Sequence, residues 1–162
     1  MKLILIYFLL LLPLHLQAKE ISKDKRENST FTGTLKLSPL AFGAEVGYHV
    51  SPDTVVGVNW DIDHLVVIAW SSQTLYTKFF FGNSFFTKLG AGYFKANSDF
   101  DESQGKGINF IIGNEWIKNN GFVIGADWIG QSIYYKENSS SEDKNKWAKI
   151  LHLPKFRIGY AF

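Results

Sequence analysis

The last seven residues of the chain alternate strictly between large apolar side chains and small or charged ones. The large residues are Phe156, Ile158, Tyr160 and Phe162, and those between them are Arg157, Gly159 and Ala161. Because successive side chains of a β-strand point to opposite faces, this period of two places all the large side chains on one face. A soluble protein rarely exposes such a face. The end of the chain therefore predicts a sheet whose apolar face is covered by protein or by lipid.

The first 18 residues have the layout of a secretory signal peptide. A positive charge at Lys2 precedes a nearly unbroken apolar run of about 14 residues, which gives way to charged residues after Ala18. The run is shorter than the roughly 20 residues that a membrane-spanning helix requires. We therefore expect export and cleavage after Ala18, with a retained anchor as the alternative. Residues 19–30 are polar, and we expect them to be a poorly ordered periplasmic lead-in.

Cysteine usage and net charge narrow the class of protein further. The chain has no Cys, which excludes lipoprotein attachment through an N-terminal cysteine. A secreted domain of this size would often carry disulfides, so a bacterial envelope protein fits at least as well. The formal net charge of +2 is too small to indicate a nucleic-acid-binding protein. The chain is rich in aromatic residues, with 14 Phe, 7 Tyr and 5 Trp, which a lipid-facing barrel can display outward.

From Phe31 onward the chain consists of alternating segments separated by turn signals, with no sustained helical period. Eight segments are predicted as strands: residues 31–38, 41–50, a third starting at 54, then 73–81, 85–95, 106–117, 122–135 and 147–162. The short connections are 51–53, 82–84 and 118–121, and the longer polar ones run from Asn97 to Gly105 and from Lys136 to Lys146. Such alternation of short turns and longer outer loops is typical of an up-and-down antiparallel transmembrane β-barrel.

Two parts of this assignment stay open. Residues 54–72 alternate for longer than one short strand, so the stretch from His64 to Trp70 is either an extended strand above the membrane or an apolar outer loop. The segment from Phe31 to Ser38 is followed almost at once by the second segment. Without it the strand count would be odd, whereas barrel closure favours an even number.

Alternation alone does not say which face of the strands looks outward, but the residue types do. One face carries glycines and mid-strand charges of both signs, which suits the narrow interior of an eight-stranded barrel. The predicted interior polar network is Glu45, Asn59, Asp61, Lys78, Lys88, Asn109, Glu115, Asp127 and Arg157. The other face carries aromatic residues that we expect at the membrane interfaces. These are Tyr48, Trp60, Trp116 and Trp128.

The strand spacing and the C-terminal pattern resemble the small eight-stranded outer-membrane barrels typified by OmpX and the membrane domain of OmpA. The resemblance covers residues 31–162. It implies a location in the bacterial outer membrane, contact with membrane lipid and lipopolysaccharide, and a monomeric state. It also implies that the barrel-assembly machinery recognises the C-terminal stripe of Phe156, Ile158, Tyr160 and Phe162. We expect a structural or surface-interaction role through the outer loops, an interior plugged by charges, and no reaction, cofactor, metal or nucleic-acid partner.

Two alternatives from other classes stay open. His49 and Ser51 resemble the His-x-Ser unit of PagL-type lipid A deacylases, and Glu45 lies on the same strand face to orient the histidine. However, Ser51 opens a turn expected on the periplasmic side, and Pro52 stands where that family has Asn. The other alternative is a soluble ligand-binding barrel with its apolar face inward. The chain lacks the early Gly-x-Trp motif and the disulfides of lipocalins.

Overall fold

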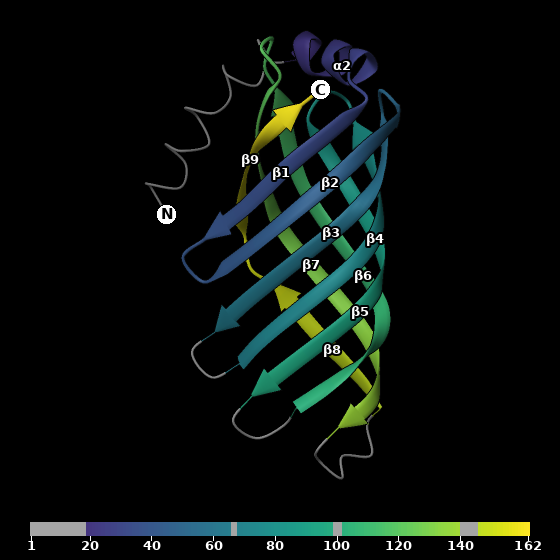
Figure 1. Cartoon of the computed structure of the whole chain (residues 1–162), viewed down its shortest axis with the longest axis vertical. Helices are drawn as coiled ribbons and strands as arrows, with labels where there is room; N and C mark the ends of the chain where they lie inside the picture. Colours follow the sequence, from purple (N-terminus) through teal and green to yellow (C-terminus); the bar gives the residue numbers. More distant parts are fainter. Residues whose placement is uncertain (1–18, 66–67, 99–101, 140–145) are drawn as a thin grey trace.

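The computed structural model of the chain describes residues 19–65, 68–98, 102–139 and 146–162. The predicted signal peptide, residues 1–18, lies outside the described residues. The described part is an antiparallel sheet rolled into a barrel, with a helix across one end (Figure 1).

Consecutive strands follow one another in up-and-down order, and each pairs with the next. They are β1 (Phe31–Ser38), β2 (Ala41–Ser51), β3 (Thr54–Leu65), β4 (Ile68–Phe81), β5 (Phe85–Ser98), β6 (Glu102–Ile117) and β7 (Phe122–Ser139). Along each of them, large apolar residues alternate with polar, small or charged ones, which is the period of a strand with two different faces. The first predicted segment is therefore a true strand, β1.

The last strand position of the barrel is divided between two strands. Both β8 (Trp147–His152) and β9 (Lys155–Ala161) pair with β7, one after the other. Pro154 lies between them, where its missing N–H breaks the ladder. β9 also pairs with β1 and closes the ring. In the described part of the chain the ring has eight strand positions, because β8 and β9 share one. The predicted fold class, an all-β up-and-down antiparallel barrel, is confirmed.

The two ends of the barrel differ, and we call them the helix end and the loop end. The short turns after β2, β4 and β6 lie at the helix end together with α2 (Lys19–Asn28). At the loop end β3 meets β4, β5 meets β6, and β7 meets β8 (Figure 1). Up-and-down order thus separates the two sets of connections as the sequence predicted. Within the described ranges, β8 has a strand neighbour on the β7 side only, so its other edge is unpaired at the loop end.

The stretch from His64 to Trp70 belongs to the β3–β4 pair. His64 pairs with Ala69 and Asp63 pairs with Trp70 across the two strands. Of the two interpretations that the sequence left open, the extended strand is therefore correct for the described residues. β4 begins at Ile68, five residues earlier than predicted.

The two predicted polar loops are also partly strand. β5 runs to Ser98 and β6 begins at Glu102, so only residues 99–101 of the first predicted loop fall outside the described strands. β7 runs to Ser139, so the second predicted loop is shorter at its start. The change to polar residues did not mark the ends of the strands. Polar side chains suit the rim of a barrel, and the backbone hydrogen-bond ladder continues through these residues.

The prediction of a poorly ordered lead-in at residues 19–30 is wrong for Lys19–Asn28, which forms α2. Ser22 and Arg26 lie one turn apart and are fully buried against the barrel. This segment lacks an apolar face, so the usual helical period was absent from the sequence. The helix is held by polar contacts to the barrel instead. Among the described residues, no helix is long and apolar enough to cross a bilayer.

Candidate functional site: the charged interior

The interior of the barrel is lined by charged side chains of both signs. On the described strands the buried cations are Lys36, Lys78, Lys88, Lys155 and Arg157, and the buried anions are Glu45, Asp61, Asp63, Glu115 and Asp127. None is more than 4% exposed. Each of the eight strand positions contributes at least one of these charged residues, because alternate side chains of a strand point inward. The equal numbers of the two signs matter, since an uncompensated buried charge costs several kcal/mol.

Glu45 is the centre of a first cluster, the Glu45 group. Its members are Glu45, Lys78, Lys88, Glu115, Asp127 and Arg157. The Glu45 carboxylate lies 2.6 Å from Lys78, 2.8 Å from Lys88 and 2.5 Å from Arg157. Lys78 and Arg157 also contact Glu115, each at 3.0 Å. One carboxylate therefore joins cations from three strands across the barrel.

A second cluster, the Asp61 group, lies toward the loop end. Lys36 contacts Asp61 at 2.6 Å, and Lys155 lies 3.3 Å from Asp61 and 2.9 Å from Asp63. These pairs link β1, β3 and β9, which are far apart in sequence. They form a second layer of ion pairs, closer to the loop end than the Glu45 group.

Asn59 connects the two clusters. Its side-chain N–H donates to Asp61 at 2.7 Å, and its Oδ1 accepts from Lys36 and, at 3.5 Å, from Lys88. Lys36 also reaches Asp127 of the Glu45 group at 3.9 Å. The result is a continuous ladder of charged and polar groups through the interior.

The structure brings together eight of the nine residues predicted for the interior network. Asn109 is inside the barrel and buried, yet neither polar atom of its side chain has a hydrogen-bond partner among the described residues. Lys36, Asp63 and Lys155 also belong to the network and were not among the predicted residues. The phase of the alternation could have found two of them, since Asp63 follows Asp61 by two residues and Lys155 precedes Arg157 by two.

Toward the loop end, three side chains stand in the order of an acyl-transfer triad. Ser132 Oγ lies 2.6 Å from His152 Nε2, and His152 Nδ1 lies 3.4 Å from Asp63 Oδ2. Ser132 is fully buried, however, and Asp63 is held by Lys155. A nucleophile must reach its substrate. The arrangement as it stands ties β3, β7 and β8 together.

Two clusters of apolar and aromatic side chains pack among the charges of the interior. Toward the loop end lie Trp70, Phe94, Tyr134 and Ile150, and toward the helix end lie Val55, Tyr76, Phe80, Phe86 and Ile111. Phe94 stacks on Tyr134 with ring centroids 5.8 Å apart. On β4 and β6, Lys78 and Glu115 lie closer to the helix end than Tyr76 and Ile111 do, so the helix-end cluster interleaves with the charges.

α2 seals the helix end through Arg26. The guanidinium lies 3.9 Å from the centre of the Phe80 ring and donates to the backbone oxygens of Pro52 at 2.6 Å and Asn83 at 2.9 Å. Ser22 adds a hydrogen bond from the backbone N–H of Ile117 at 3.1 Å. Burial lowers the pKa of Arg26, but an arginine stays protonated in proteins. One cation thus holds two turns and an aromatic ring.

His49 and Ser51 do not form a catalytic pair. His49 Nε2 bonds the hydroxyl of Thr32 inside the barrel, whereas the Ser51 hydroxyl accepts from the backbone N–H of Asp53 in the turn. The register between β2 and β3 shifts between His49 and Ser51, which separates their directions. The described geometry offers the histidine no serine to activate.

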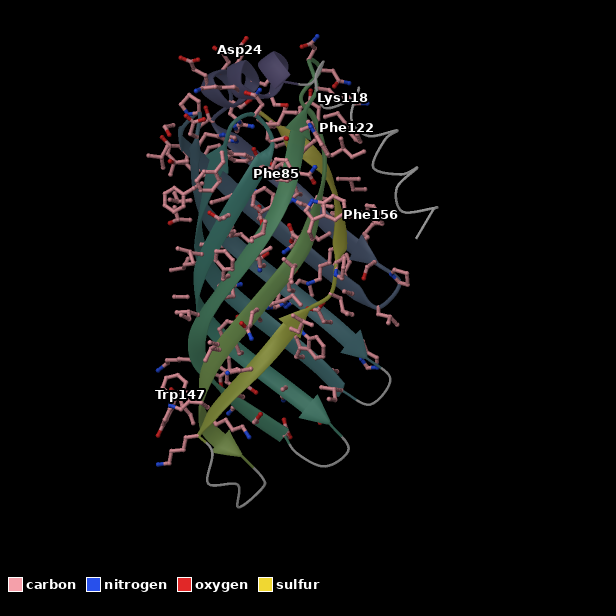
Figure 2. The ribbon with its side chains drawn as sticks, turned by 180° about the vertical axis from the view of Figure 1, so that it is seen from behind. Asp24, Phe85, Lys118, Phe122, Trp147 and Phe156 are labelled. Atoms are coloured by element: carbon pink, nitrogen blue, oxygen red, sulfur yellow. The ribbon has the colours of Figure 1, made fainter. Side chains whose placement is uncertain are left out.

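The outer wall is apolar, and Figure 2 shows its side chains projecting away from the ribbon. The four residues of the predicted assembly signal lie on the outward face: Phe156, Ile158, Tyr160 and Phe162. Tyr48 and Trp116 lie near the helix end, whereas Trp60 and Trp128 lie near the middles of β3 and β7. Trp147, which was not among the predicted interface aromatics, lies at the loop end (Figure 2).

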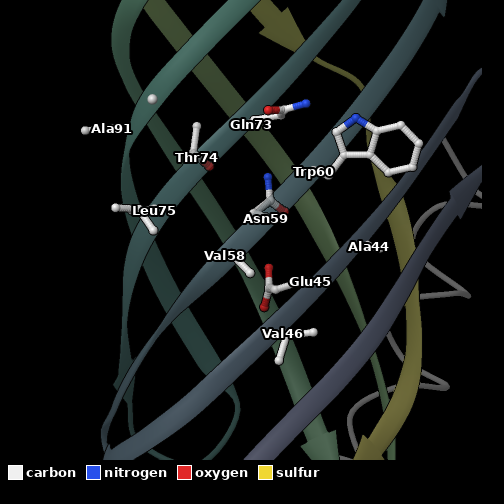
Figure 3. A pocket seen from close by; sticks show the side chains of 11 residues that line it. Ala44, Glu45, Val46, Val58, Asn59, Trp60, Gln73, Thr74, Leu75 and Ala91 are labelled. Atoms are coloured by element: carbon white, nitrogen blue, oxygen red, sulfur yellow. The ribbon is translucent and has the colours of Figure 1, made fainter.

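A shallow hollow in the outer wall crosses β2 to β5 (Figure 3). Its outward lining is mostly apolar, with the small Ala44 and Ala91 among Val58 and Leu75, and Gln73 adds one polar side chain.

No family model matches the chain, and no curated protein matches it either. Among solved structures, the chain is similar to the N-terminal β-barrel domain of Pseudomonas aeruginosa OprF, with a TM-score of 0.52 and 18% sequence identity. The similarity covers 82% of this chain and 95% of that domain. At this identity the likeness concerns the fold, and it agrees with the predicted resemblance to small eight-stranded barrels.

Proposed function

We propose that the chain is an integral outer-membrane β-barrel with a charged, plugged interior and a structural or surface-interaction role. The observation that carries this proposal is the inverted polarity of the barrel. Ion pairs fill the inside, while large apolar side chains such as Leu75 and Phe156 are each 70% exposed on the outside. A soluble ligand-binding barrel has the opposite arrangement, because its apolar residues must leave water. A bilayer covers an apolar exterior.

The connections between the strands give the proposed orientation. The helix end faces the periplasm and the loop end faces outward, as in barrels with short periplasmic turns. Open sheet edges are not tolerated in hydrocarbon, so the unpaired edge of β8 places the loop end beyond the apolar core in either orientation. β8 then lies above the apolar core of the membrane. Contacts with lipopolysaccharide and the action of the barrel-assembly machinery on the C-terminal stripe belong to this proposal.

Membrane fractionation followed by gel electrophoresis tests the location. We expect the protein in the outer-membrane fraction, with a mobility that changes when the folded sample is boiled. Release into the periplasmic fraction on osmotic shock would support the soluble alternative instead. A sample that stays in the membrane without heat-dependent mobility would contradict the barrel.

Planar-bilayer recording of the refolded protein tests the plug. The Glu45 and Asp61 groups fill the interior, so we expect no stable large-conductance openings. A variant that removes three charges of the ladder, Glu45→Gln with Lys78→Gln and Lys88→Gln, provides a comparison. If the unaltered protein opens a large pore, the plugged interior is wrong.

The deacylase alternative has its own measurement. It requires that purified protein release acyl chains from lipid A and that His49→Ala abolish the release. We expect neither preparation to deacylate, because His49 contacts Thr32 and not Ser51.

A further inference from the structure

We propose that the outer wall of β5 to β8 near the loop end binds a phosphate group of an anionic outer-leaflet lipid through Lys106 and Lys149. This inference rests on the proposed membrane location and names one lipid class for it.

The binding surface is a row of outward side chains that the strand register places side by side. Tyr93 of β5 pairs with Lys106 of β6, Lys106 pairs with Tyr135 of β7, and Tyr135 pairs with Trp147 of β8. We call this the lysine–aromatic row. Tyr135 and Trp147 are in edge contact, with ring centroids 5.5 Å apart. Lys149 lies one outward position below Trp147, opposite Ile133.

The row lies at the height where lipid headgroups begin. Lys106 is eleven residues from Ile117 at the helix end of β6. At about 3.3 Å per residue and a tilt of about 40°, this is a height of roughly 28 Å, just beyond an apolar band of about 25 Å. Tyrosine and tryptophan prefer this interface. The unpaired edge of β8 independently places Trp147 and Lys149 outside the hydrocarbon.

On the described strands, the positive charges at outward positions lie on this side of the barrel alone. The lysines at outward positions of the described strands are Lys95, Lys106 and Lys149, on β5, β6 and β8. The outward positions of β1 to β4 carry no Lys or Arg in the described ranges. This asymmetry is more than general solubility requires, because a solvated rim would carry charge on all sides.

The chemistry of the row fits phosphate. Lysine binds phosphate as a mobile point charge, and the neighbouring aromatic rings fix the depth of the headgroup. Glu137 lies 3.4 Å from the Lys106 ammonium, whose side chain is still 77% exposed. Lys149 has no ion-pair partner among the described residues. Both ammonium groups are therefore accessible to phosphate from the lipid side.

The test compares two lipids in native mass spectrometry of the refolded full chain in neutral detergent micelles. The probes are bisphosphorylated lipid A and the same lipid with both phosphates removed. We expect at least tenfold tighter binding of the phosphorylated lipid. At about fivefold per lysine, Lys106→Gln with Lys149→Gln should weaken it roughly 25-fold.

Control variants separate this contact from general charge. Lys118→Gln makes the same change at the helix end, beside Phe122, and should leave binding unchanged. The double variant Lys106→Arg with Lys149→Arg should retain the binding of the phosphorylated lipid. Heat-modifiable mobility shows that each variant is folded. Equal binding of the two lipids, or an unaffected double Gln variant, overturns the inference.

Further outcomes distinguish a lipid phosphate from free phosphate, and failure of this inference from failure of the proposed function. If inorganic phosphate alone displaces the lipid at millimolar concentration, the site recognises free phosphate and the lipid assignment is wrong. If the protein fractionates with the outer membrane but shows no preference for phosphate, only this inference fails. If it is released as a soluble protein, the proposed function fails as well.

Discussion

At the scale of single residues, Glu45 is the group on which the interior depends most. Its carboxylate compensates Lys78, Lys88 and Arg157 at once, so Glu45→Gln leaves buried cations without sufficient negative charge. Breaking a buried ion pair in this way costs about 3–5 kcal/mol. We expect the free energy of unfolding, measured by urea titration in lipid vesicles, to fall by about that amount.

Glu102→Gln is the matched control for this change. Glu102 pairs with Lys95 at 2.6 Å, but both side chains are about half exposed. Solvent screens an exposed pair, so the variant should unfold almost as the unaltered chain does. Similar losses for the two variants would show that burial does not set the value of the Glu45 contacts.

Two glycines give a second residue-scale prediction. A Cβ at Gly57 would lie 2.1 Å from the backbone oxygen of Val46 and 2.7 Å from the Tyr76 hydroxyl, whereas a Cβ at Gly33 would meet nothing within 4 Å. Gly57→Ala should therefore cost about 1–3 kcal/mol of overpacking. Gly33→Ala should be neutral or slightly stabilising. The same urea titration measures both, and equal effects would contradict the crowding at β2 and β3.

At the scale of secondary-structure elements, the strands could be predicted and α2 could not. The sequence of each strand has a hydrophobic period of two, which does not depend on what the strand packs against. α2 has no apolar face, and its order comes from Arg26 meeting Phe80 and two distant turns. Contacts of this kind depend on tertiary structure, so local sequence does not contain them. The only local signal was the spacing of Ser22 and Arg26 by one helical turn.

Arg26 should therefore control the order of α2. Arg26→Gln removes the ring contact and at least one of the two hydrogen bonds to turn carbonyls, each worth about 1.5–3 kcal/mol for a charged donor. We expect the amides of Lys19–Asn28 to exchange with deuterium at least tenfold faster, while β1 to β7 stay protected. The measurement is hydrogen exchange followed by mass spectrometry.

Lys23→Gln controls for the loss of a positive charge on the same helix. Lys23 pairs with Asp53 at 3.3 Å at the surface, and both side chains are 49% exposed. Its removal should change exchange little. If α2 exchanges equally in both variants, the helix is held by general charge and not by the buried Arg26 contacts.

At the scale of the whole molecule, the ring and its inside-out polarity could be read from the sequence. Charges of both signs on the same strand face as glycines indicated the interior. Glu45 and Arg157 do meet there, and Asp61 pairs with Lys36 in the neighbouring cluster. Which charges pair could not be read, because the stagger between strands sets the height of each residue. For the same reason the lysine–aromatic row appears only once β5 to β8 are aligned.

The absence of cysteine makes the orientation of the barrel directly testable. Lys146→Cys places a thiol at the exposed loop end, and Asn119→Cys places one in an exposed turn at the helix end. If the loop end faces outward, a membrane-impermeant thiol reagent should label the first variant in intact cells. It should label the second only after the outer membrane is permeabilised. The reverse pattern would invert the barrel and remove the lysine–aromatic row from the outer leaflet, whereas labelling of both variants in intact cells would contradict a membrane-spanning wall.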